Sequence, residues 1–200
     1  MGEPNLFIIG APKCGTSSLY YYLGQHPDVN VSSRKEPHYL ASDLNWVEGW
    51  GVENKKEYES LYDMKKKINI DASTWYLYSE SARKKIAENY PHSKLIVCLR
   101  HPVNFMDSLW WHLKARGKES SKDLIEALEK ENAIKKGASF SPAPFRKSVL
   151  YRECACFSIF IKKYLDVFGP DRMKVILLED LAENPEKTLK AVLKYLDLNY

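Results

Sequence analysis

The fold of this chain is set by one segment near its amino terminus, Asn5-Leu6-Phe7-Ile8-Ile9-Gly10-Ala11-Pro12-Lys13-Cys14-Gly15-Thr16-Ser17-Ser18-Leu19-Tyr20. Residues 6–9 are apolar and partly β-branched, and the run is too short for a helix, so they predict a buried parallel strand. Two glycines and a proline interrupt the pattern over residues 10–15. Residues 16–23 then predict a helix that ends at Gly24.

A strand, a glycine loop and a helix in this order predict an anion-binding site. Backbone N–H groups at the helix start and the helix dipole both favour a negative charge there. Lys13 adds a cation, and the hydroxyls of Thr16 and Ser17 add donors. Gly10 and Gly15 have the spacing of a Walker A motif, but Thr16 stands where that motif has its lysine. The alternative is a tight turn with a surface lysine.

The composition is that of an ordinary globular domain. The chain has 200 residues, of which 44% are hydrophobic and 28% charged, and its net charge is +4. This mild positive charge suits an anionic ligand but does not by itself indicate nucleic acid. The four cysteines show no disulfide or zinc spacing. We expect no metal site, no nucleic-acid partner and no membrane segment in this chain, and a cytoplasmic location, with the lumen of the Golgi as the alternative.

Strand and helix patterns alternate along the chain. We expect strands at 6–9, 29–31, 68–71, 94–99 and 173–178, and helices at 16–23, 79–89, 102–115, 122–135, 149–168 and 185–196. Residues 41–57 and 137–144 are expected to be irregular. This alternation predicts an α/β fold with three layers, in which helices cover both faces of a central parallel sheet. Ligands of such sheets bind at the carboxyl ends of the strands.

A second candidate anchor lies in the middle of the chain. Arg100 ends the strand at 94–99, and Ser108 follows eight residues later on the helix that Pro102 begins. Both side chains could reach one phosphate, because arginine binds two phosphate oxygens at once. Alone, this pair is equally explained by an ion pair and a packed serine.

The two anchors together resemble the sulfotransferases that use 3′-phosphoadenosine 5′-phosphosulfate (PAPS), whose fold is like that of the P-loop nucleoside triphosphate hydrolases. The resemblance covers residues 1–200 as a single sulfotransferase domain. It implies that the loop and helix start hold the 5′-phosphosulfate, through Lys13, Cys14, Gly15, Thr16, Ser17 and Ser18. It also implies that Arg100 and Ser108 hold the 3′-phosphate, and that 3′-phosphoadenosine 5′-phosphate (PAP) is the product.

This chain departs from the family pattern at two places. The family's glycine-rich loop, which completes the 3′-phosphate and adenine site, has no counterpart before the chain ends at Tyr200. We therefore expect the domain to lack that loop. Heparan-type members carry a lysine where Ala72 stands here, so a heparan-like acceptor is not expected.

The segment Arg34-Lys35-Glu36-Pro37-His38-Tyr39-Leu40 resembles the Lys-Glu-Pro-His-Phe-Phe segment of carbohydrate and bacterial sulfotransferases. The resemblance implies that Glu36 is the base that takes the acceptor's proton. The neighbouring cations are expected to lower the pKa of Glu36. His38 is the other candidate base, because its ordinary pKa is closer to neutral. A solvated charged loop is the alternative.

The predicted function is an in-line, metal-free transfer of the sulfuryl group to a hydroxyl or amine of a small-molecule or carbohydrate acceptor, with Lys13 stabilising the leaving phosphate. A nucleotide kinase remains an alternative, because Asp71 ends a strand where a metal ligand could stand. A non-catalytic nucleotide-binding module is a third interpretation. Three aromatic residues could line the acceptor pocket or stack on adenine, although core packing explains them as well: Trp75, Tyr76 and Tyr151.

Overall fold

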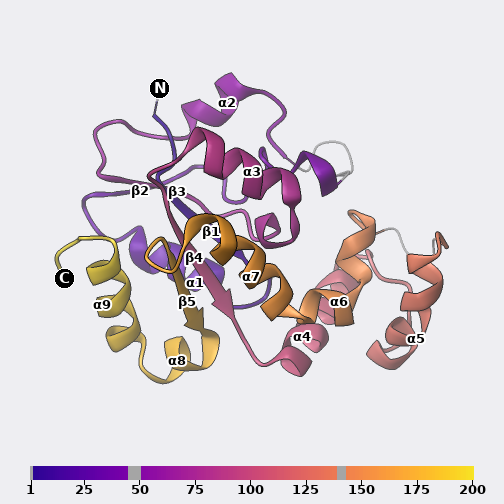
Figure 1. Cartoon of the computed structure of the whole chain (residues 1–200). Helices are drawn as coiled ribbons and strands as arrows, with labels where there is room; N and C mark the ends of the chain where they lie inside the picture. The colour runs from indigo at the N-terminus through magenta and orange to yellow at the C-terminus, as the bar shows by residue number, and fades with distance from the viewer. Residues whose placement is uncertain (1, 45–50, 139–142) are drawn as a thin grey trace.

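The computed structural model describes residues 2–44, 51–138 and 143–200 (Figure 1). Within these ranges, five strands form one sheet in the order β2-β3-β1-β4-β5, and every pairing is parallel. The strands are β1 (Leu6–Gly10), β2 (Val29–Val31), β3 (Ile68–Asp71), β4 (Lys94–Leu99) and β5 (Met173–Leu177). The expected α/β fold with a central parallel sheet is confirmed.

Helices cover both faces of this sheet. They are α1 (Thr16–Leu23), α2 (Lys55–Ser60), α3 (Glu80–Asn89), α4 (Pro102–Ala115), α5 (Leu124–Lys135), α6 (Tyr151–Ala155), α7 (Phe157–Phe168), α8 (Leu178–Glu183) and α9 (Pro185–Tyr195). The connections β1–β2 and β3–β4 run in opposite directions across the sheet, so right-handed crossovers place α1 and α3 on opposite faces. Accordingly, α1 contacts α9, and α3 lies beside α7 (Figure 1). No helix in the described ranges is long and apolar enough to cross a bilayer.

Strand β1 is the centre of the sheet. All of its residues are buried, and it pairs with β3 on one side and β4 on the other. After β1 the chain passes to β2 at one edge of the sheet, whereas β4 lies on the other side of β1. The direction of winding therefore changes between β1 and β4, and a ligand crevice is expected beyond their carboxyl ends.

Three sequence-based expectations about helices were wrong. The helix expected at 149–168 is interrupted at Cys156, whose φ of −76° and ψ of 56° are not helical, so α6 and α7 are separate. The last strand ends at Leu177, and α8 begins at once. Helix α2 begins at Lys55, inside the segment 41–57 that was expected to be irregular. Residues 45–50 of that segment, and 139–142 of the loop expected at 137–144, lie outside the described residues.

Candidate active site

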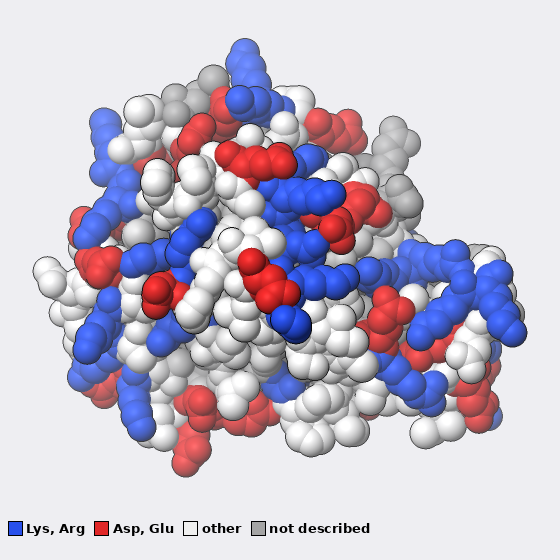
Figure 2. All heavy atoms as spheres, in the orientation of Figure 1, with Lys and Arg blue, Asp and Glu red and all other residues white. Residues whose placement is uncertain are grey.

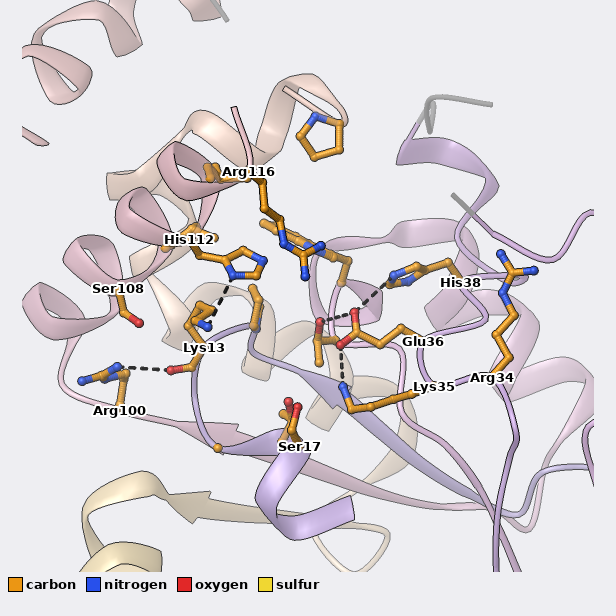
Figure 3. Close-up of a pocket in the computed structure, with 18 residues that line it drawn as sticks. Lys13, Ser17, Arg34, Lys35, Glu36, His38, Arg100, Ser108, His112 and Arg116 are labelled. Atoms are coloured by element: carbon orange, nitrogen blue, oxygen red, sulfur yellow. Dashed lines mark hydrogen bonds and ion pairs between the residues drawn. The ribbon is translucent and has the colours of Figure 1, made fainter. Parts of the chain in front are cut away.

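A cavity of about 890 Å³ lies at the carboxyl ends of β1 and β4. Its walls come from the loop after β1, the loop after β2, the turn after β3 and one face of α4. The lining residues are Pro12, Lys13, Gly15, Thr16, Ser17, Arg34, Lys35, Glu36, His38, Thr74, Trp75, Arg100, Ser108, Leu109, His112, Leu113, Arg116 and Pro144 (Figure 3). Both predicted anchors and both candidate bases therefore face one cavity.

The loop after β1 turns sharply into α1. Lys13 and Gly15 both have left-handed backbone conformations, with φ of 62° and 83°. The backbone angle of Gly15 favours glycine, and a Cβ atom there would lie 2.7 Å from Cδ1 of Leu178 on α8, whose side chain would have to shift. Gly15 is the N-cap of α1 and offers no side-chain cap, which leaves the first N–H groups of the helix available to an anion.

Arg100 joins the two anchors. Its Nη1 donates a hydrogen bond to the backbone oxygen of Lys13 at 3.3 Å. The backbone N–H of Ala11 donates to the carbonyl oxygen of Cys98 on β4 at 2.7 Å, which fixes the loop against that strand. The Nε of Arg100 is buried and has no hydrogen-bond partner among the described residues. A buried guanidinium N–H without a partner is costly, and an oxyanion in the cavity is a fitting acceptor for it.

Helix α4 presents a polar stripe to the cavity. Ser108, His112 and Arg116 are each four residues apart, so they lie on one side of α4 and its C-cap (Figure 3). Ser108 was expected from the sequence, whereas His112 and Arg116 were not. The spacing of four residues was the signal that could have found them.

His112 contacts Lys13. Its Nδ1 lies 3.5 Å from the Lys13 Nζ. Burial, together with the nearby charges of Lys13 and Arg116, holds the pKa of His112 below its ordinary value of 6.5. The imidazole is therefore neutral at pH 7, and because an ammonium only donates, Nδ1 is the acceptor in this contact. His112 thus orients the Lys13 ammonium at the cavity wall.

Glu36 is surrounded by three donors. Its Oε1 lies 2.5 Å from Lys35 Nζ, while its Oε2 accepts from Thr74 Oγ1 at 3.2 Å and lies 3.3 Å from His38 Nε2 (Figure 3). Burial alone raises the pKa of Glu36, but the contacts with His38 and Lys35 outweigh it and lower the pKa from 4.5 to about 2. The pKa is lowered as expected, but of the two neighbouring cations Lys35 contributes beside His38, which was not expected to, and Arg34 is not among the causes. Glu36 is therefore a carboxylate at neutral pH.

A buried carboxylate lies beneath the loop that carries Glu36 and His38. Asp71, at the end of β3, is fully buried and accepts hydrogen bonds from Ser73 Oγ at 2.6 Å, Tyr58 OH at 2.7 Å and Tyr76 OH at 2.9 Å. Burial raises the pKa of Asp71 above 3.8, and these three hydrogen bonds oppose that rise. Asp71 does not line the cavity.

Two of these hydroxyl groups also hold the loop. Ser73 Oγ accepts from the backbone N–H of His38 at 2.9 Å, and Tyr76 OH accepts from that of Leu40 at 3.2 Å. Glu36 and His38 have left-handed φ values of 60° and 54°, which cost free energy in non-glycine residues. The hydrogen bonds from the turn after β3 compensate for this cost and fix where both candidate bases lie.

Of the remaining residues that the sequence suggested, some line the cavity and others lie in the core. Trp75 lines the cavity, whereas Tyr76 and Tyr151 are fully buried and donate to Asp71 and Glu119. Cys14 and Ser18 do not line the cavity. The Cys14 thiol is buried, and that burial raises its pKa to about 12, so it is an apolar support for the loop.

Comparisons with known proteins identify a family for this chain. The family described as "Sulfotransferase domain" matches residues 3–200. The crystal structure of a sulfotransferase from Alicyclobacillus acidocaldarius superimposes with a TM-score of 0.88 and 30% sequence identity, over 100% of this chain and 83% of that one.

Two curated relatives are similar over almost the whole of this chain. The bifunctional heparan sulfate N-deacetylase/N-sulfotransferase 1 of Caenorhabditis briggsae is 27% identical over 98% of this chain and 23% of its own length. Carbohydrate sulfotransferase 15 of Mus musculus is 24% identical over 98% of this chain and 44% of its own length. The chain thus spans less than half the length of either relative.

Proposed function

The chain belongs to the sulfotransferase family, and we propose that it transfers the sulfuryl group of PAPS to a hydroxyl or amine of a small-molecule or carbohydrate acceptor. The observation that carries this proposal is the hydrogen bond between Arg100 and Lys13, because it brings two cations from separate loops to one cavity. A donor that carries phosphate groups at both its 3′ and 5′ positions needs two such cationic sites on one cavity.

In this function each anchor binds one end of the donor. Lys13, Gly15, Thr16 and Ser17 bind the 5′-phosphosulfate, and Arg100 with Ser108 binds the 3′-phosphate. Negative charge grows on the 5′-phosphate as the sulfur–oxygen bond breaks, and the Lys13 ammonium stabilises it. His112 keeps that ammonium in place as a neutral acceptor. PAP is then the product.

The acceptor approaches from the side of Glu36 and His38. Glu36 is the proposed base that removes the acceptor's proton, and it is ionised at neutral pH. A carboxylate with a pKa of about 2 has little affinity for a proton, so proton transfer to it has a small driving force. A second assignment gives the proton to Nδ1 of His38, whose Nε2 donates to Glu36 at 3.3 Å, so that Glu36 stabilises the resulting charge. Because Nδ1 is buried, this assignment requires the acceptor to reach that nitrogen.

The kinase alternative depended on Asp71. Its carboxylate is enclosed by three hydroxyl groups and does not line the cavity, so it is not placed to bind a metal beside a nucleotide there. The position of Asp71 at the end of a strand, which supported a kinase, is therefore explained by a structural role. A non-catalytic nucleotide-binding module remains the competing proposal, and turnover distinguishes it.

Calorimetry and a transfer assay test this function. We expect PAP to bind more tightly than AMP or ATP, and labelled sulfate to move from PAPS to an acceptor in a screen of hydroxyl and amine compounds. Lys13→Ala and Glu36→Ala are each expected to lower the transfer rate at least about a hundredfold. Wild-type rates in both variants would exclude these roles, and PAP binding without any turnover would favour the non-catalytic module.

A further inference from the structure

The cavity is lined by more cations than the proposed binding of PAPS uses. Five Lys and Arg side chains line it, and Glu36 is the single carboxylate among its lining residues. The proposed binding of PAPS uses Lys13 and Arg100. Three cations remain: Arg34, Lys35 and Arg116.

Arg116 differs from the other two. Arg34 Nη1 lies 3.4 Å from Glu57 Oε1, and Lys35 Nζ lies 2.5 Å from Glu36 Oε1. Within residues 2–44, 51–138 and 143–200, the Arg116 guanidinium has no hydrogen bond or ion pair. A guanidinium at the wall of a cavity, with no carboxylate beside it, is suited to bind an oxyanion through two parallel hydrogen bonds.

The position of Arg116 separates it from the 3′-phosphate site. Arg116 follows Ser108 by eight residues along α4, which corresponds to a rise of about 12 Å. Figure 3 shows its guanidinium between His112 on one side and Glu36 and His38 on the other, while Arg100 and Ser108 lie at the other end of the cavity. Arg116 therefore faces the side from which the acceptor approaches.

The surface beyond Arg116 has the same sign of charge. Residues 114–153 contain ten Lys and Arg but six Asp and Glu, an excess of four that equals the net charge of the whole chain. Figure 2 shows Lys and Arg side chains gathered in a band that runs from the middle of this face to the lobe formed by α5 and α6. Such a surface raises the local concentration of anionic molecules.

We propose that the acceptor carries an anionic group, a carboxylate or a sulfate ester, that binds Arg116 while the reacting hydroxyl or amine lies at Glu36 and His38. Arg34 and Lys35 add to the positive potential on this side. This inference rests on the proposed function, since it assigns the donor to the opposite end of the cavity. Arg116 is exposed, so water solvates its guanidinium when no anion is bound, and an anionic group on the acceptor would gain a bidentate contact that a neutral acceptor cannot make.

Three matched probes test the proposal on the whole chain saturated with PAP. They are 4-nitrophenyl β-D-glucoside, 4-nitrophenyl β-D-glucuronide and the 6-sulfate of the glucoside, which differ at one carbon. Binding is measured by ligand-observed NMR, and PAP affinity by calorimetry. The variant is Arg116→Gln. The control is Lys136→Gln, which removes the same charge from an exposed residue of the lobe that does not line the cavity.

We expect either anionic probe, or both, to bind at least about tenfold more tightly than the glucoside, and Arg116→Gln to abolish this preference. The two anionic arms show whether carboxylate or sulfate ester is preferred. PAP affinity should be unchanged in Arg116→Gln, and Lys136→Gln should behave as wild type. Equal binding of all three probes, no binding of any, or a loss of PAP affinity in Arg116→Gln would each overturn the proposal. Failure of the wild-type chain to bind PAP would instead overturn the proposed function.

Discussion

The guanidinium of Arg100 donates a hydrogen bond to the main-chain oxygen of Lys13 over 3.3 Å, although the two residues are 87 positions apart in the chain. One comes from the loop after β1 and the other from the end of β4, and these strands are neighbours in the sheet. Arg100 therefore has two roles in the proposed function. It binds the 3′-phosphate, and it holds the backbone of the loop that binds the 5′-phosphosulfate.

Replacing Arg100 by alanine should weaken PAP binding. Charge-assisted hydrogen bonds contribute about 1.5–3 kcal/mol each, so we expect the dissociation constant for PAP to rise about ten- to a hundredfold, as measured by calorimetry. AMP lacks the 3′-phosphate, and its affinity should change much less. Equal losses for PAP and AMP would show that Arg100 acts only through the loop.

The contact between His112 and Lys13 predicts that the pH profile of transfer has an acid limb, which is a fall in the rate at low pH. The pKa of His112 lies below 6.5, so the ring is neutral at pH 7 and accepts from the ammonium. As the pH falls through that lowered pKa, the ring becomes charged and repels Lys13, and the rate should fall. His112→Asn keeps an uncharged acceptor and should lose this limb. If the variant keeps the acid limb, a group other than His112 causes it.

Much of the site could be predicted because its parts are local in sequence. The strand, loop and helix around Lys13 occupy adjacent positions, and the short apolar run before Arg100 is equally plain. Each pattern points to the carboxyl end of a strand. Parallel pairing alone then brings Lys13, Glu36 and Arg100 to one edge of the sheet.

The missed features depend on contacts between distant residues. The spacing from Ser108 could have placed His112 on the same side of α4, but its contact with Lys13, 99 positions away, is visible only once α4 packs beside the loop. Asp71 ends a strand as expected, but the hydroxyl groups that enclose it show that it supports the site without facing it. The interruption at Cys156 likewise follows no local signal, since residues 149–168 contain neither glycine nor proline.

The acid stability of the fold should depend on Glu36. Its pKa is lowered from 4.5 to about 2 in the folded chain, so the folded state binds fewer protons than the unfolded state in that range. The stabilisation is fully present above pH 4.5 and is lost as the pH falls toward 2. Because 31% of the side chain is exposed, solvent screening reduces it to about 1–3 kcal/mol.

Urea unfolding at pH 7 and pH 3 measures this effect. The wild-type chain should lose more free energy of unfolding between these two pH values than Glu36→Gln, because the glutamine does not titrate. Other carboxylates contribute equally to both proteins, so the difference between the two losses isolates Glu36. Identical losses would show that Glu36 has the same affinity for protons in the folded and unfolded chains.

The two tyrosines that donate to Asp71 form a matched pair. Tyr58 and Tyr76 each donate to Asp71 Oδ2, but only Tyr76 also accepts from the backbone N–H of Leu40. Tyr58→Phe and Tyr76→Phe should both lower the free energy of unfolding by about 1–3 kcal/mol, because each leaves Asp71 with one buried hydrogen bond fewer.

Only Tyr76→Phe should also affect transfer. The loop from Glu36 to Leu40 then loses one of the contacts that hold its left-handed residues in place, and a base that is displaced slows the chemical step. We expect kcat to fall about tenfold or more in Tyr76→Phe and to remain within about twofold of wild type in Tyr58→Phe, with PAP affinity unchanged in both. Equal loss of kcat in the two variants, in proportion to their stability, would mean that Asp71 only stabilises the fold. A loss confined to Tyr76→Phe identifies the turn after β3 as the support that positions Glu36 and His38.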